Sequence, residues 1–142
     1  MKELTVIARV DQLDYVLQFI NLELNEYGCP KKERMQIAIA VEEIYVNIAQ
    51  YAYAPKVGTV IIRFWTEYEP MRFTIQFVDG GKPYNPLTKP DPDISLDAEK
   101  RGIGGLGVFI VKKNMDDVRY EYMNGKNVFT ISKKVVTEVS VM

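Results

Sequence analysis

The stretch "RGIGGLGVFIVKKN", residues 101–114, contains four glycines in six residues and then continues as an apolar helical pattern. Glycine costs roughly 0.5–1 kcal/mol per helical position relative to alanine, so a compensating interaction is expected where this helix begins. A phosphate group bound by backbone N–H groups at a helix N-terminus is one such interaction. A flexible hinge is the alternative. The glycines fit neither a P-loop, which needs a following lysine and serine or threonine, nor a Rossmann turn, which needs a strand leading into it.

The composition is that of one soluble domain, residues 1–142, with a sizeable core. Hydrophobic residues make up 47% of the chain, and 18 basic against 19 acidic residues leave a net charge of −1. This balance argues against direct nucleic-acid binding. No apolar run approaches the ~18 residues of a membrane span, and the N-terminus meets acidic residues too early for a signal peptide. A single cysteine, Cys29, fits a reducing cytosol, so a cytoplasmic protein is expected.

The chain contains no histidine. This excludes a histidine triad, a histidine-ligated zinc site and a self-phosphorylating histidine. Any catalysis must therefore use carboxylates, amides, lysine, arginine, backbone groups or a bound metal.

The first third of the chain is predicted to form a strand and two helices. Residues 3–9 alternate and are rich in β-formers. Asp11 is placed to cap a helix that ends near Asn25, and Pro30 suits the first turn of a second helix that runs to about Tyr53. The second helix is apolar nearly all round, so we predict that it is central and buried.

The remainder is predicted to contain two hairpins and a short helix. A proline-rich segment, residues 79–102, is too long for a plain connector and is interpreted as a lid, and the tail 135–142 as peripheral. The order β-α-α-β-β-lid-α-β-β predicts a two-layer α/β sandwich, with helices on one face of a mixed, mostly antiparallel sheet. The predicted elements are strands 59–67 and 72–78 joined at Glu69-Pro70, a helix from Val108 to Met115, and strands 117–123 and 127–133 joined at Asn124-Gly125.

The central helix carries an acid and an amide within "EEIYVN". Glu43 and Asn47 are four residues apart and share one face. Asn47 offers an oxygen to a hard cation such as Mg²⁺, and Glu43 could accept a proton from an attacking hydroxyl or water. The alternative is that Glu42, Glu43 and Asn47 line a solvated stripe of the helix.

A second polar stretch, "VDGGKP", directly follows a predicted strand at residues 78–83. Asp79 can accept a hydrogen bond from an exocyclic amine such as that of adenine, and the glycines allow a ring or backbone to come close. The alternative is an ordinary turn, because Asp-Gly and Gly-Gly are common turn dipeptides.

The order of these motifs resembles the GHKL ATPase superfamily, which shares the Bergerat ATP-binding fold. The likeness comprises Glu-x-x-x-Asn on a helix, Asp-x-Gly-x-Pro after a strand, a proline-rich lid, and Gly-x-Gly-Gly-x-Gly opening a helix, over residues 1–134. Within it the chain is most similar to the bacterial anti-sigma-factor serine/threonine kinases, including Met-Asp-Asp-Val after the last helix. Tyr51 departs from the pattern, because many relatives carry histidine there.

The resemblance implies a role for each matching residue. Glu43 would be the catalytic base, Asn47 would coordinate Mg²⁺, Asp79 would bind the adenine amine, and Arg101 would lie near the γ-phosphate. The implied nucleotide-binding positions are Asn47, Asp79, Gly81, Pro83, Gly102, Gly104, Gly105 and Gly107.

The function implied is that of an ATP- and Mg²⁺-dependent kinase. It would phosphorylate a serine or threonine of an anti-anti-sigma protein and sequester a sigma factor. Members of this group often dimerise through the N-terminal region, so a homodimer is a further expectation. Two alternatives are a non-catalytic, ATP-dependent partner-switching module and a detached histidine-kinase ATPase domain. The two long N-terminal helices favour the anti-sigma group over the last of these.

Overall fold

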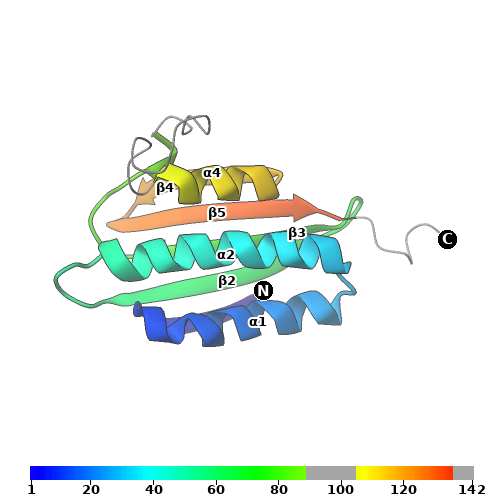
Figure 1. The fold of residues 1–142 in the computed structure, drawn as a ribbon, viewed down its shortest axis with the longest axis horizontal. Coiled ribbons are helices and arrows are strands. Elements are labelled where there is room, and N and C mark those ends of the chain that lie inside the picture. Colours follow the sequence, from blue (N-terminus) through cyan, green and yellow to red (C-terminus); the bar gives the residue numbers. More distant parts are fainter. Residues whose placement is uncertain (89–104, 136–142) are drawn as a thin grey trace.

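The protein folds as two layers, an antiparallel sheet and a set of helices that cover one of its faces (Figure 1). The computed structural model describes residues 1–88 and 105–135. Within them, five strands follow the spatial order β1-β2-β3-β5-β4, and all four pairings are antiparallel. The predicted sandwich is therefore confirmed, although within the described residues the sheet is wholly antiparallel rather than mixed. The strands are β1 (Lys2–Ile7), β2 (Thr59–Glu67), β3 (Arg72–Asp79), β4 (Asp117–Met123) and β5 (Lys126–Lys134).

Among the described residues the helical layer contains three α-helices, with α2 between the other two (Figure 1). These helices are α1 (Leu13–Glu26), α2 (Lys31–Tyr51) and α4 (Gly105–Asn114), with short 3-10 turns η1 (Val10–Gln12) and η2 (Pro86–Thr88). None of the helices within the described ranges is long and apolar enough to cross a membrane.

The start of the first helix differs from the sequence prediction. Asp11 does not cap it: its carboxylate accepts a hydrogen bond from the Arg9 guanidinium at 2.7 Å, within the 3-10 turn. The α-helix begins at Leu13, and its N-cap residue Gln12 makes no side-chain capping bond. The Asp11 carboxylate therefore binds the Arg9 side chain instead of capping the helix.

The second helix is central, as predicted, but it is not buried all round. Pro30 is the N-cap rather than a residue of the first turn, and the helix ends at Tyr51. Met35 and Ile39 lie on its outer face and are 55% and 42% exposed. The long apolar run thus supplies both the core contacts of α2 and part of its outer surface.

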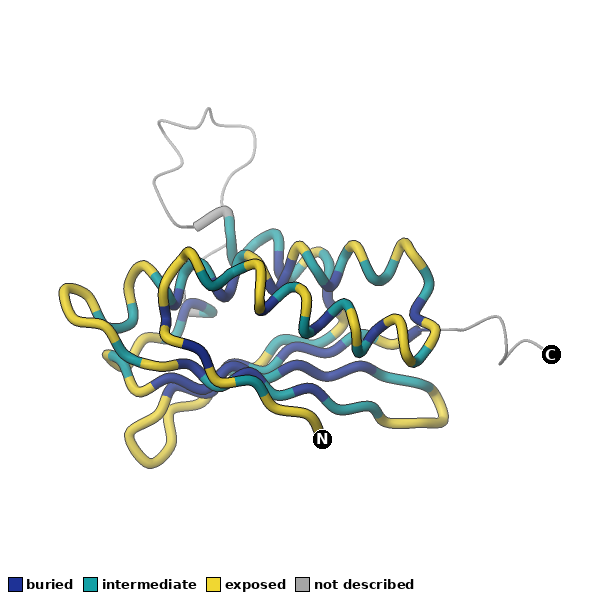
Figure 2. Tube along the Cα trace, turned by 90° about the horizontal axis from the view of Figure 1, so that it is seen from below, coloured by how far each residue is buried: buried dark blue, intermediate teal, exposed yellow. Residues whose placement is uncertain are grey.

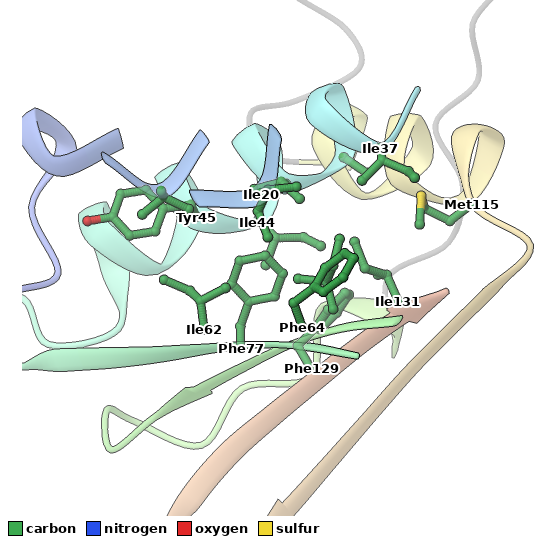
Figure 3. Close-up of a cluster of buried hydrophobic side chains, with 14 of the residues drawn as sticks. Ile20, Ile37, Ile44, Tyr45, Ile62, Phe64, Phe77, Met115, Phe129 and Ile131 are labelled. Carbon is green, nitrogen blue, oxygen red and sulfur yellow. The ribbon is translucent and has the colours of Figure 1, made fainter. Parts of the chain in front are cut away.

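The core lies between the two layers (Figures 2 and 3). Tyr45 of α2 is fully buried, and its hydroxyl donates to the Arg9 carbonyl oxygen at 2.7 Å, which joins the helix to the segment between β1 and η1. Tyr27, Phe64 and Phe73 form an aromatic cluster with ring centroids 5.8–6.3 Å apart. Phe64 and Phe73 are almost fully buried, and a side chain of this size contributes about 1.5–3 kcal/mol by burial.

The hairpin predicted at Asn124-Gly125 is present. Both residues have positive φ, at 53° and 76°, which matches the right-handed twist of the strands that they join. The turn at Glu69-Pro70 is also present, with Glu69 at a φ of 63°. The backbone N–H of Val135 donates to the Met71 carbonyl oxygen at 3.0 Å, which continues the pairing of β5 with the start of β3.

The glycine-rich helix begins earlier than predicted, at Gly105 rather than Val108, and ends at Asn114. Gly105 and Gly107 therefore belong to its first turn. Arg101, Gly102 and Gly104 lie outside the described residues. So do most of the predicted lid and residues 136–142 of the tail.

Candidate functional site

A cleft of about 620 Å³ lies between the C-terminal half of α2, the start of α4, the end of β3 and the start of β5. This volume falls in the range of small-molecule sites, roughly 300–1,000 Å³. Apolar side chains make up most of its walls, and polar groups are concentrated at a few places. The lining residues include Glu43, Ile44, Asn47, Ile48, Tyr51, Asp79, Lys82, Pro83, Tyr84, Gly107, Val108, Val111, Tyr120, Asn127 and Phe129.

Glu43 and Asn47 both line the cleft, one helical turn apart on α2. Both are partly buried, whereas Glu42 is exposed and does not line the cleft. Among the residues that the structure describes, neither side chain makes a hydrogen bond or an ion pair. The solvated-stripe interpretation therefore fits Glu42 but not Glu43 and Asn47, whose carboxylate and amide line the cleft without a partner among the described residues.

Gly107 brings α4 against the same carboxylate. A Cβ atom at this position would lie 2.8 Å from Glu43 Oε2, closer than such atoms ordinarily approach. Gly105 is the first residue of the helix, so the backbone N–H groups of its first turn have no partner within the helix. The positive end of the helix dipole and the Glu43 carboxylate therefore lie at the same end of the cleft.

Asp79 lies at the other end and is only 5% exposed. Its Oδ1 atom accepts hydrogen bonds from the Gly81 backbone N–H at 2.9 Å and from Asn127 Nδ2 at 3.0 Å. Asn127 faces Asp79 directly across the β3–β5 pairing. These two polar residues occupy the last row of the inward face of the sheet, beyond the apolar row formed by Phe77 and Phe129.

The segment after Asp79 is tied to the end of α2. The Lys82 N–H donates to the Ala52 carbonyl oxygen at 2.9 Å. A Cβ atom at Gly81 would lie 2.2 Å from the same oxygen, so only glycine allows this approach. Gly81 adjoins the cleft wall without lining it, whereas Pro83 does line the cleft.

Two tyrosines follow Asn47 in the sequence, Tyr51 at the end of α2 and Tyr53 just beyond it. Tyr51, in the place of the histidine of many GHKL proteins, lines the cleft and is 58% exposed at its rim. The Tyr53 hydroxyl donates to the Thr59 carbonyl oxygen and accepts from the Gly80 N–H, both at 2.6 Å. Tyr53 thereby holds the end of β3 against the α2–β2 connection.

Sequence reasoning missed the contribution of β4 and β5. Tyr120, Asn127 and Phe129 all line the cleft. The available signal was the alternation of β5, which directs Asn127 and Phe129 to the same face. Burial raises the pKa of Tyr120, and the nearby Asp79 charge adds to this, so its hydroxyl stays protonated and can donate.

The fold and this cleft define a two-layer α/β domain with a small-molecule site between a central helix and the start of a glycine-rich helix. Residues 6–133 match the histidine kinase-like ATPase domain family. The match covers most of the chain, so the chain belongs to this family, and the resemblance to GHKL ATPases is confirmed.

Individual relatives agree with this assignment. The chain is 32% identical over 108 residues to the serine-protein kinase RsbW of Bacillus mycoides, covering 73% of this chain and 66% of that protein. It is 29% identical to RsbW of Listeria monocytogenes, covering 74% and 68% of the two chains. The chain thus spans just under two thirds of the Bacillus relative.

A solved structure agrees on the fold. The crystal structure of the RsbU and RsbW domains of Rv1364c from Mycobacterium tuberculosis aligns with a TM-score of 0.60 at 14% identity. The alignment covers 96% of this chain and 34% of that one.

Proposed function

We propose that the cleft binds ATP and that the protein is a serine/threonine kinase of the anti-sigma type. One observation supports this above all: motifs 36 positions apart, at Glu43 and Asp79, and a third at Gly107, line a single cleft. The similarity to proteins named serine-protein kinase RsbW points the same way. The proposed substrate is a small anti-anti-sigma protein, and a sigma factor is the proposed second partner. A cytoplasmic location and a homodimer are proposed on the same likeness.

The two ends of the cleft suit the two ends of a nucleotide. Asp79 offers a carboxylate oxygen to the amine of adenine, in a cleft with mostly apolar walls that suit a base. The first turn of α4 offers backbone N–H groups and a favourable dipole to phosphates. Gly81 and Pro83 would shape the base end, and Gly102, Gly104 and Arg101 the phosphate end.

Mg²⁺ fits the donors at the phosphate end. The described residues contain no group of three or more acidic, histidine or cysteine side chains that could hold a metal by themselves. Mg²⁺ in nucleotide sites usually keeps several waters and is held by one or two protein oxygens together with the phosphates. The amide of Asn47, which has no hydrogen-bond partner among the described residues, can supply one such oxygen. When bound, Mg²⁺ would neutralise charge on the phosphates.

The proposed role of Glu43 is that of general base. The substrate serine oxygen attacks the γ-phosphorus, the bond from that phosphorus to the bridging oxygen of ADP breaks, and the serine proton passes to Glu43. The carboxylate is partly buried, has no partner among the described residues, and lies beside the start of α4. It is therefore free to receive a proton at the place where the phosphates would lie.

The test is phosphate transfer from γ-labelled ATP to a candidate anti-anti-sigma protein. The proposal predicts acid-stable label on the partner, as a phosphoserine or phosphothreonine gives. Acid-labile label on a histidine-containing partner would favour the detached histidine-kinase alternative. ATP-dependent complex formation without label would favour the partner-switching module.

A further inference from the structure

Asn127 is the most fully hydrogen-bonded buried side chain at the base end of the cleft. It is 6% exposed. Its Nδ2 donates to Asp79 Oδ1 at 3.0 Å and to the Lys82 carbonyl oxygen at 2.9 Å. Its Oδ1 accepts from the Tyr84 N–H at 3.2 Å and from the Tyr120 hydroxyl at 2.5 Å. One side chain thus joins β3, β4 and the segment that follows β3.

This set of bonds uses the whole capacity of a carboxamide. An asparagine side chain has two N–H donors and two acceptor lone pairs on its oxygen. Both donors and both lone pairs are satisfied by protein groups, so Asn127 retains nothing to offer to a ligand. Its influence on a ligand must pass through the groups that it holds.

Of the groups that Asn127 holds, Asp79 has the most direct bearing on ligand binding. Its Oδ1 already accepts two hydrogen bonds, from Asn127 and from Gly81. Within the described residues no hydrogen bond reaches Oδ2. The carboxylate therefore has one oxygen fixed in the protein and one left to accept from a donor in the cleft.

We propose that Asn127 is a positioning residue that sets the selectivity of the cleft for a base carrying an amino group. It orients Asp79 so that Oδ2 is presented, and it anchors the cleft wall at Lys82 and Tyr84. The inference rests on the proposed nucleotide-binding function. It adds to that function a residue on β5 that acts without touching the ligand.

The test compares two nucleotides on two variants. ATP and purine riboside triphosphate differ only by the 6-amino group, so the ratio of their dissociation constants isolates recognition of the amine. A hydrogen bond to a charged group makes this ratio on the order of 10- to 100-fold in the wild type. Asn127→Leu keeps the approximate size but removes the donor facing Asp79, and should lower the ratio to near one.

The matched control is Gln76→Ala. Gln76 Nε2 donates to Thr130 Oγ1 at 3.2 Å, so this side chain also links β3 to β5, but on the opposite face of the sheet. Removing it should affect stability without changing the nucleotide ratio. A role for Asn127 in sheet stability alone would make the two variants behave alike.

Three outcomes decide the matter. A ratio near one in Asn127→Leu with a wild-type ratio in Gln76→Ala supports the proposal. An unchanged ratio in Asn127→Leu overturns it, whatever happens to the absolute affinities. If neither nucleotide binds the wild type, the proposed function itself has failed. Should Asn127→Leu not fold, as judged by circular dichroism, Asn127→Ala removes the same donor with a smaller side chain and has the same two outcomes.

Discussion

The polar groups at the two ends of the cleft differ in burial and in hydrogen bonding. At the base end, Asp79 and Asn127 are almost fully buried and tied to each other and to the backbone. At the other end, Glu43 and Asn47 are only partly buried and, among the described residues, have no partner. A buried polar group is tolerated when its hydrogen bonds are made, and a group left open must be reached by water or a ligand. The base end is therefore preorganised by protein hydrogen bonds. The other end, with Glu43 and Asn47, is called the open end and has polar groups available for chemistry.

The largest effect on activity is expected from a substitution at the open end, at Glu43. Glu43→Gln keeps the shape of the side chain but removes its basicity. Loss of a general base typically lowers a rate by about 10²–10⁴-fold. We expect phosphate transfer to fall by this amount, with ATP affinity nearly unchanged, in single-turnover assays with labelled ATP.

The control for this variant is its neighbour. Glu42→Gln removes an equal charge one residue away, from a side chain that is exposed and does not line the cleft. It should leave the transfer rate unchanged and stability within about 0.5 kcal/mol. Equal rates for Glu43→Gln and the wild type would end the general-base proposal and favour the non-catalytic module.

The base end should be sensitive to backbone crowding. In Gly81→Ala, the new methyl group would lie 2.2 Å from the Ala52 carbonyl oxygen, and neither backbone segment can move freely. Overpacking of this kind costs about 1–3 kcal/mol. We expect the free energy of unfolding, measured with urea, to fall by this amount, and nucleotide binding to weaken because the Lys82–Tyr84 segment shifts.

Gly125→Ala is the matched change at a distant glycine. Gly125 has a φ of 76° and open space around it, so alanine there costs about 1–2 kcal/mol of backbone strain but leaves the cleft, and with it nucleotide binding, unchanged. If Gly81→Ala unfolds at the same urea concentration as the wild type, the close approach to α2 is not a structural requirement.

An effect confined to recognition of the base is expected from the Asp79 carboxylate at the base end. Asp79→Asn presents an amide that can offer a donor where the adenine amine needs an acceptor. The dissociation constant of ATP should rise about 10- to 100-fold, the value of a hydrogen bond to a charged group. That of purine riboside triphosphate should change little, as calorimetry can show. A parallel rise for both nucleotides would mean that Asp79 holds the fold rather than the base.

Local patterns predicted the parts of the site that lie within one element. Helical spacing placed Glu43 and Asn47 on one face, and a strand end placed Asp79 at the cleft. The hairpin at Asn124-Gly125 followed from turn chemistry, because those residues adopt positive φ readily. Each of these predictions needed only residues a few positions apart.

Long-range pairing could not be obtained in this way. β5 lies between β3 and β4, so the last strand in sequence pairs with one from the middle of the chain. Without that order nothing indicated that Asn127 would face Asp79. The prediction that Asp11 caps the first helix was wrong for a related reason, because the carboxylate accepts a hydrogen bond from Arg9 instead.

The most direct test of the central claim is calorimetric titration of the wild-type protein with ATP, with and without Mg²⁺. The account predicts saturable binding in the micromolar range that weakens when Mg²⁺ is removed, because the open end of the cleft then faces the unneutralised charge of the phosphates. No detectable binding at millimolar ATP in the presence of Mg²⁺ would contradict it.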